Sequence, residues 1–298
     1  MTRKLSRTLA GSVVTGLLLA AVACGDSGTG PTLDSHAILF QVQTTLYSIN
    51  PDGSGEHQLT DGTHFDGYGA WSPNGNRIAF TSNRGGIAGL YTMRADGSDV
   101  VQVATPPGFG GPYLMSWSSK NVLAYSWVTD AAQYGNLVVI PAAGGTPVTL
   151  QADRVVATGD WSPDGNRIAF GSIRDGDTTH IFVINADGTG LTEITKLAGS
   201  AEGAPSWSAD GRHIAFMRAF GGADGIWFVN ADGSNPVRVT TKIGDAYPSW
   251  SPDGSRIAFT STRDGPGDLY VVNADGSNLQ RLTTTGVYRT GTKWRKVP

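Results

Sequence analysis

The amino-acid sequence predicts an all-β fold, a six-bladed β-propeller of four-stranded antiparallel blades, and three observations lead to it. Turn residues are abundant: the 298 residues include 41 Gly, and the 25 acidic residues include only three Glu. Gly and Asp favour tight turns, whereas Glu favours helices. Tryptophans recur at intervals of 43 to 46 residues, and short apolar runs repeat between them. Four short strands in a period of this length are typical of a propeller blade.

The tryptophan of each repeat marks the first strand of a blade. Three copies are nearly identical, with WSPNGNRIAF, WSPDGNRIAF and WSPDGSRIAF in the chain. Because one tryptophan stands in the innermost strand of each blade, we expect these rings to pack between blades rather than to stack on sugars. The series is Trp71, Trp117, Trp161, Trp207, Trp250 and Trp294.

The second and third strands are the runs of RIAF and LYVVN type, and a fourth strand of VRVT or QRLT type follows. Pro, Asp and Gly in the intervening turns suit hairpins. We expect the turn aspartates to accept hydrogen bonds from nearby backbone amides; they are Asp164, Asp187, Asp210, Asp232, Asp253 and Asp275. Arg84, Arg174 and Arg263 each follow a repeat Phe by four residues, and we expect them to stack or pair between blades.

The two ends of the chain complete one blade. The N-terminal part supplies strands two, three and four (AILF, LYSIN, HQLT) without a first strand, and the C-terminal part supplies a first strand around Trp294. The sequence therefore predicts a ring closed by pairing the Trp294 strand with the N-terminal strands, which leaves no exposed seam.

The first residues depart from the all-β pattern. A basic start precedes an apolar stretch that is too short to span a bilayer and ends in Ala-Val-Ala before Cys24, the one cysteine. This segment resembles a bacterial lipoprotein signal. It predicts a signal peptide over 1–23, lipidation of Cys24, a flexible tether over 24–35 and the propeller over 36–298. An ordinary signal cleaved after Ala23 is the alternative.

The repeat WSPDG-x-RIAF, followed by LYVVNADGSN and RLT, resembles that of the TolB-like propellers over essentially residues 36 to 298. TolB itself carries an N-terminal mixed α/β domain, whereas here only the tether precedes the first strand. The lipoprotein-like signal implies a lipid-anchored protein of the cell envelope, on the periplasmic side or outer membrane. The resemblance to TolB implies a partner such as a peptidoglycan-associated lipoprotein.

The sequence offers little catalytic chemistry. The five histidines make no H-x-x-x-H spacing and no G-x-S-x-G segment occurs, so we predict no catalytic residue and no metal ligand. A cation such as calcium in the channel stays an alternative. The net charge of -3 gives no reason to expect a nucleic acid.

Function is expected in the loops that differ between repeats. These loops join strands two and three and link successive blades, and in propellers both sets emerge on one face, which we call the variable-loop face. Their aromatic and charged residues predict a protein-interaction module. A glycan or small-molecule site, or a polysaccharide-acting enzyme, at the channel mouth is the rival hypothesis. The candidate partner-binding residues are His64, Asp66, Tyr68, Tyr113, Arg154, Asp245, Tyr247 and Arg289.

Overall fold

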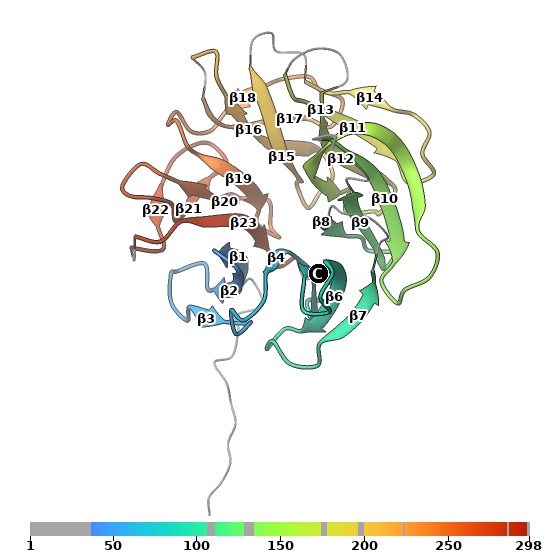
Figure 1. The fold of residues 1–298 in the computed structure, drawn as a ribbon. Coiled ribbons are helices and arrows are strands. Elements are labelled where there is room, and N and C mark those ends of the chain that lie inside the picture. Colours follow the sequence, from blue (N-terminus) through green and yellow to red (C-terminus); the bar gives the residue numbers. More distant parts are fainter. Residues whose placement is uncertain are drawn as a thin grey trace, which may run out of the picture. The chain divides into compact units, whose positions relative to one another are not determined.

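A computed structural model describes residues 37–105, 111–127, 134–173, 178–195, 200–222, 224–284 and 286–296. All regular structure in these residues is β-strand, arranged as six blades around a central channel (Figure 1). Within this part of the chain, no helix has the length and apolar character to cross a membrane. Cys24 and the predicted signal peptide and tether lie outside the described residues.

Each blade is an antiparallel sheet whose innermost strand ends in the repeat tryptophan. Blade 1 contains β4 (Asp66–Trp71), β5 (Arg77–Ser82), β6 (Gly89–Arg94) and β7 (Val101–Ala104). Blade 4 contains β15 (Ala201–Trp207), β16 (His213–Ala219), β17 (Gly225–Asn230) and β18 (Val237–Arg238). Blade 5 contains β19 (Ala246–Trp250), β20 (Arg256–Ser261), β21 (Asp268–Asn273) and β22 (Gln280–Arg281).

Blades 2 and 3 share a strand, which the repeat pattern does not predict. The shared strand is β11 (Val148–Trp161), which pairs first with β10 and then with β12. This strand runs from the outer edge of one blade to the centre of the next, with a left-handed residue at Arg154 (φ 60°), so the two blades form one seven-stranded sheet. The other strands are β8 (Pro112–Trp117), β9 (Val122–Trp127), β10 (Gly135–Pro141), β12 (Arg167–Ser172), β13 (His180–Asn185) and β14 (Thr192–Glu193).

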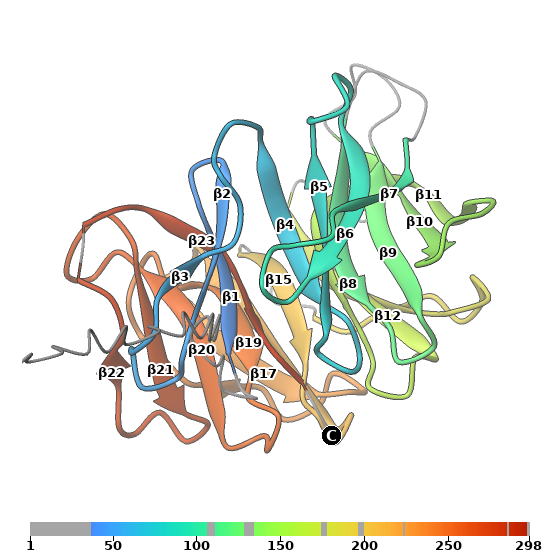
Figure 2. The same ribbon diagram turned by 90° about the horizontal axis from the view of Figure 1, so that it is seen from below.

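The sixth blade joins the two ends of the chain. Its order is β23 (Arg289–Trp294), β1 (Ile38–Val42), β2 (Thr45–Ile49) and β3 (His57–Gln58), and Ile38 of β1 pairs with Trp294 of β23. This is the pairing that the truncated repeats predict. In the side view, the loops that link blades lie at the top and the C-terminal end lies at the bottom, near the turns between strands one and two (Figure 2).

The repeat tryptophans pack between blades, as predicted. Trp207 is fully buried among Ile181 of blade 3 and Phe216 of its own blade, and Trp117 is half-buried against the cluster shared by blades 1 and 2. An arginine of the RIAF strand covers the next tryptophan, with the Arg167 guanidinium 4.7 Å from the Trp207 ring centre. Such contacts add cation–π attraction to apolar burial at the blade interfaces.

The predicted roles of the turn aspartates are confirmed and those of two loop arginines are wrong. The Asp164 carboxylate accepts a 3.0 Å hydrogen bond from the Asn166 backbone N–H, and the equivalent bond recurs at the five other turns. Arg84 and Arg263 do not bridge blades. Each folds back over the aromatic rings of its own blade, where a buried aspartate pairs with it. Arg174 lies outside the described residues.

Candidate binding site at the channel mouth

A hollow of about 520 Å³ opens at the mouth of the channel on the variable-loop face. Its walls come mostly from the innermost strands of several blades. The large side chains that line it include Tyr68, Tyr247, Met115, Met217 and Phe220. The hollow is therefore formed by several blades together and not by any single repeat.

A repeated bulge turns side chains toward this hollow. The third residue before the tryptophan adopts a left-handed backbone in four blades, with φ of 54° at Tyr68, 51° at Ala204, 53° at Tyr247 and 67° at Gly291. The pairing register shifts at these positions, as it does where an extra residue bulges from a strand. A non-glycine residue in this conformation carries roughly 1–3 kcal/mol of strain. Two tyrosines are thus held at the mouth at an energetic cost.

The tyrosines of neighbouring blades meet around the mouth. The Tyr68 and Tyr113 rings make an edge-on contact with centres 5.1 Å apart. Burial, together with the nearby hydroxyls of Tyr113 and Tyr247, raises the pKa of Tyr68 to about 12. Burial and the neighbouring Tyr288 also raise the pKa of Tyr247. These phenols are therefore neutral hydrogen-bonding groups at physiological pH.

On the blade 4 side, the hollow contains a buried carboxylate that already has its partners. Glu202 is 1% exposed, and its Oε2 lies 3.2 Å from Nδ1 of His180. Ser200 donates to its Oε1, and the Arg218 guanidinium lies 3.9 Å away. Burial raises the pKa of Glu202 in spite of these contacts. Both oxygens face groups of the protein itself, which leaves little for a ligand.

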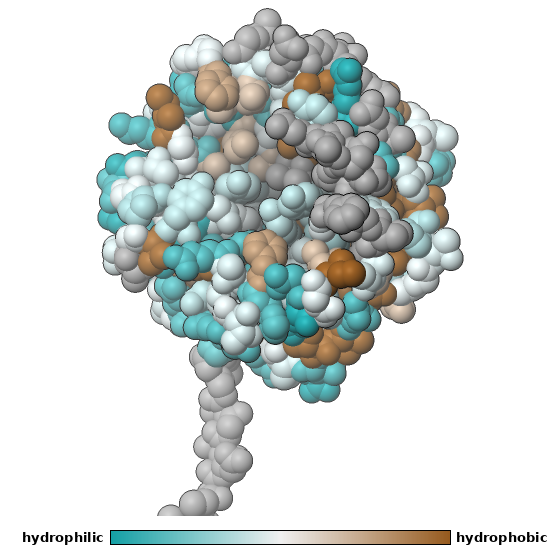
Figure 3. Space-filling view, viewed as in Figure 1, coloured by the Kyte–Doolittle hydropathy of each residue, from teal (hydrophilic) through white to brown (hydrophobic). Residues whose placement is uncertain are grey.

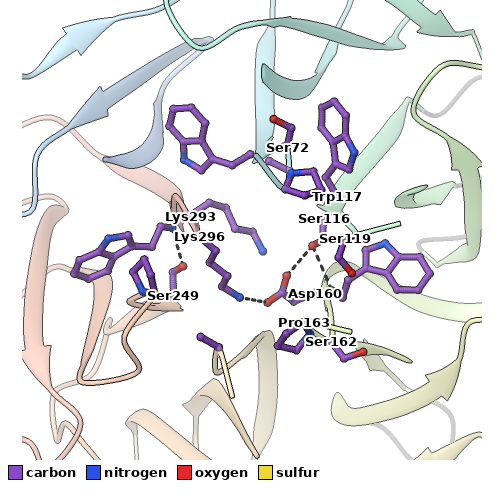
Figure 4. A pocket seen from close by; sticks show the side chains of 17 residues that line it. Ser72, Ser116, Trp117, Ser119, Asp160, Ser162, Pro163, Ser249, Lys293 and Lys296 are labelled. Carbon is purple, nitrogen blue, oxygen red and sulfur yellow. Dashed lines mark hydrogen bonds and ion pairs between the residues drawn. The ribbon is translucent and has the colours of Figure 1, made fainter. Parts of the chain in front are cut away.

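Two lysines and an aspartate form the floor, where a second hollow of about 430 Å³ opens toward the other face. Lys296 reaches across the channel to Asp160, with 3.1 Å between the Nζ and Oδ2 atoms (Figure 4). The Ser116 hydroxyl and the Trp207 backbone N–H also donate to Asp160. Burial alone would raise the pKa of Asp160, but Lys296, Lys293 and these hydrogen bonds hold it below its usual range.

This arrangement does not favour a cation in the channel. The charged side chains that line the second hollow are Asp160, Lys293 and Lys296, so positive charge predominates there. Among the described residues, no three His, Cys, Asp or Glu side chains gather as a metal ion would require. The calcium alternative therefore gains no support from the geometry.

Three of the predicted partner-binding residues are buried and serve the fold. Asp66 is fully buried and pairs with Arg84 at 2.9 Å, and Asp245 pairs with Arg263 at 2.7 Å. Arg289 is 1% exposed. Its guanidinium lies 3.3 Å from a carboxylate oxygen of Asp268 and 3.3 Å from one of Glu56. These side chains stiffen the mouth but present no charge to a partner.

The other candidates divide into two groups. Tyr68 and Tyr247 line the hollow, and Tyr113 contacts the first of them. His64 and Arg154 are exposed and do not line it. The three tyrosines are thus brought together at one mouth, whereas the two basic residues lie apart from it.

The charged residues of the channel floor were not among the site residues predicted from the sequence. The position before each repeat tryptophan holds Ala or Ser in four blades, but Asp160 and Lys293 in the other two. In the three blades that have serine there, the hydroxyl accepts a hydrogen bond from the N–H of the next tryptophan, as Ser116 does from Trp161 at 3.3 Å. Comparing the repeats at this position would have singled out the two charges.

Comparisons with known proteins agree with this fold. The family described as TolB beta propeller domain matches residues 128–296. An uncharacterized protein of Agrobacterium fabrum is 32% identical over 172 residues, which are 57% of this chain and 56% of that protein. The Tol-Pal system protein TolB of Alcanivorax borkumensis is 35% identical over 66 residues, 22% of this chain and 15% of that protein. The chain thus spans about half or less of the length of these relatives.

Solved structures share the blades at lower identity. TolB from Acinetobacter baumannii matches with a TM-score of 0.76 and 18% identity, over 87% of this chain and 66% of that one. A putative TolB from Agrobacterium tumefaciens matches with a TM-score of 0.67 and 24% identity, over 85% and 90% of the two chains. Since the family match covers more than half of the sequence, this chain belongs to the family of TolB β-propeller domains.

Proposed function

We propose that this chain is an exported, envelope-associated lipoprotein whose propeller binds another envelope protein through the variable-loop face. Lipidation at Cys24 would hold it on a membrane surface, and residues 24–35 would act as the tether. Membership of the TolB family supports an envelope location. One relative is a Tol-Pal system protein, which favours a partner such as a peptidoglycan-associated lipoprotein.

The proposal rests on the distribution of solvent-exposed large apolar side chains. Among the described residues, five such side chains expose more than half of their surface, and four of them lie in loops of the variable-loop face. Ile243 is 79% exposed and Phe220 is 72% exposed. In Figure 3, which views this face, apolar side chains are interspersed with polar ones around the mouth. The four residues are Ile87, Phe220, Ile243 and Tyr288.

Exposed apolar groups within a polar surround are typical of a protein interface. Aromatic anchors such as Phe220 and Tyr288 provide contact area at little conformational cost. The fifth exposed side chain, Val148, lies on the outer strand β11. The uneven distribution therefore favours the variable-loop face as the docking surface.

Photo-crosslinking in cells tests the interaction. A photoreactive residue is placed at Phe220, Ile243 and Tyr288 in turn, with a matched apolar control at Leu279, which is 45% exposed in a turn of the opposite face. Mass spectrometry identifies the products. We expect one discrete protein adduct from the three loop positions and none from the control. Equal adducts at the control position, or none at the loops, would refute the proposal.

Membrane attachment has its own test. Substituting Cys24→Ser removes the acceptor for the lipid, so we expect the protein to move from the membrane fraction to the soluble fraction after cell breakage. Incorporation of labelled palmitate measures the modification directly. Unchanged fractionation and no label in the parent protein would leave the ordinary signal peptide as the better explanation.

A glycan or small-molecule site, or a polysaccharide-acting enzyme, is the second candidate function. The enclosed hollow with its tyrosine wall favours it, because aromatic faces and phenol hydroxyls suit sugar rings. A glycan array probed with the protein and with a Tyr247→Ala variant tests this function. Glycan binding lost in the variant, together with failure of the loop crosslinks, would establish it in place of the interaction.

A further inference from the structure

The two charged side chains that line the mouth hollow differ in their partners. Among the residues that the structure describes, Glu202 and Lys293 are its charged lining residues. The Glu202 carboxylate already has His180 and Ser200 as partners, as described above. Lys293 donates one hydrogen bond, to the Gly159 carbonyl at 3.3 Å, and among the described residues no carboxylate lies within ion-pair distance of it.

The nearest carboxylate on the channel floor cannot easily serve Lys293. Asp160 accepts from Ser116 on Oδ1 and from the Trp207 N–H and Lys296 on Oδ2. Its oxygens thus accept hydrogen bonds from other groups, although the charge of Asp160 still attracts Lys293. Lys293 is half-buried, and this burial lowers its pKa although the charge of Asp160 acts in the opposite direction. A buried cation with one neutral acceptor is stabilised when a negative group reaches it.

Other polar groups of the hollow have spare hydrogen-bonding capacity beside Lys293. Thr292 is 2% exposed, and its hydroxyl has no hydrogen-bond partner among the described residues. Tyr68 and Tyr247 form the wall above, and Met217 offers an apolar surface for an aliphatic stem. The hollow thus combines a cation with tyrosine side chains and an apolar surface.

We propose that this cup receives an acidic side chain of the protein partner, whose carboxylate pairs with Lys293 while its aliphatic stem lies against Met217 and the two tyrosines. This inference rests on the proposed interaction through the variable-loop face. Charge complementarity selects the occupant, because Lys293 and Lys296 outnumber the single Asp160 at the channel floor, and among the described residues Asp160 forms its ion pair with Lys296 and not with Lys293. A buried charge pair of this kind governs specificity as well as affinity.

The methionines make the test direct. Met115 and Met217 line the hollow, whereas Met93 is fully buried between blades 6 and 1 and serves as an internal reference. Isotope-labelled methionine methyl groups are observed by NMR while the full chain is titrated with a pentapeptide that carries one glutamate, acetyl-Gly-Ser-Glu-Ser-Gly-amide. Its glutamine twin is the matched probe.

We expect the glutamate peptide to shift the Met115 and Met217 signals and to leave Met93 unchanged. Lys293→Gln should weaken this binding about ten-fold or more, because it removes the cation of a charge-assisted hydrogen bond. Lys242→Gln is the control variant, since it removes an exposed lysine of the same face outside the hollow. An unchanged Met93 signal shows that each variant is folded.

Three results would overturn the inference: equal shifts from the two peptides, unchanged binding in Lys293→Gln, or no shift at all. Shifts from digalacturonate but not from the glutamate peptide would also overturn it, in favour of an acidic glycan. If crosslinking captures a partner while the peptide leaves the Met115 and Met217 signals unchanged, the proposed function stands and the inferred pairing of an acidic side chain with Lys293 is wrong. If crosslinking fails while the methionines respond, the carboxylate site stands without the protein partner.

Discussion

Replacing Asp160 with alanine removes a carboxylate that is 6% exposed and accepts hydrogen bonds on both oxygens. The Trp207 N–H then loses its acceptor in a buried position, which costs about 1–3 kcal/mol. Lys296 loses an ion pair but keeps contact with solvent, so that loss adds only about 0.2–1 kcal/mol. We therefore expect Asp160→Ala to lower the free energy of unfolding by about 1–4 kcal/mol.

Asp160→Ser provides the matched comparison. Serine occupies the same position in blades 2, 4 and 5, where its hydroxyl accepts the N–H of the next tryptophan. The hydroxyl should do the same for Trp207, which leaves mainly the loss of the lysine contact. Asp160→Ser should thus cost about 1 kcal/mol, clearly less than alanine.

Equilibrium unfolding in urea, followed by tryptophan fluorescence, measures both variants. The pKa of Asp160 lies below its usual range in the folded protein, so its contribution is full above the unfolded pKa of about 4. The contribution declines as the pH falls through the folded pKa. The gap between parent and Asp160→Ser should narrow in acid. Equal losses in the serine and alanine variants would refute the hydrogen-bonding role.

Three further predictions concern the scaffold. Trp207→Ala should cost about 3–5 kcal/mol in urea unfolding, because its ring is fully buried between two blades; a loss below about 1 kcal/mol would contradict that packing. Gly97→Ala should destabilise the fold more than Gly291→Ala, since an added Cβ would lie 2.3 Å from the Leu59 carbonyl oxygen in the first case and meet nothing within 4 Å in the second; thermal unfolding of the two variants compares them. Hydrogen bonds from two serines hold the pKa of Asp253 at about 2, so its stabilising effect is present above the ordinary pKa of 3.8 and is lost as the pH falls toward 2. Asp253→Asn should therefore flatten the acid limb of the stability profile, and an unchanged profile would argue against the turn contacts.

The repeat predicts the blades well because each blade must bury the same surface against its neighbour. Trp207 and Trp294 lie in equivalent inter-blade clusters although different residues surround them. The truncated repeats at the two ends likewise predict the pairing of Ile38 with Trp294. Packing that recurs once per repeat can therefore be predicted from a single sequence.

The direction in which loop side chains point is harder to predict from the sequence. Asp66 and Asp245 look like exposed loop charges, yet both face inward to an arginine of the same blade. A signal for this pairing does exist, because each aspartate precedes its arginine by 18 residues. Equal separation in two repeats indicates a structural pair, whereas a binding residue has no reason to recur with its partner.

The candidate site lies where the backbone is repeated but the side chains are not. Four blades keep a left-handed residue at the bulge, and glycine, which adopts that conformation without strain, occupies only one of them. Two of the others carry tyrosine, at an expected cost of about 1 kcal/mol or more each relative to glycine. The fold alone would favour glycine or a small residue there, so the tyrosines at Tyr68 and Tyr247 support the proposed binding role of the mouth. The same argument applies to Lys293 at the channel floor. Serine at the equivalent position of three blades accepts the N–H of the next tryptophan, so the fold does not require the positive charge that lysine adds.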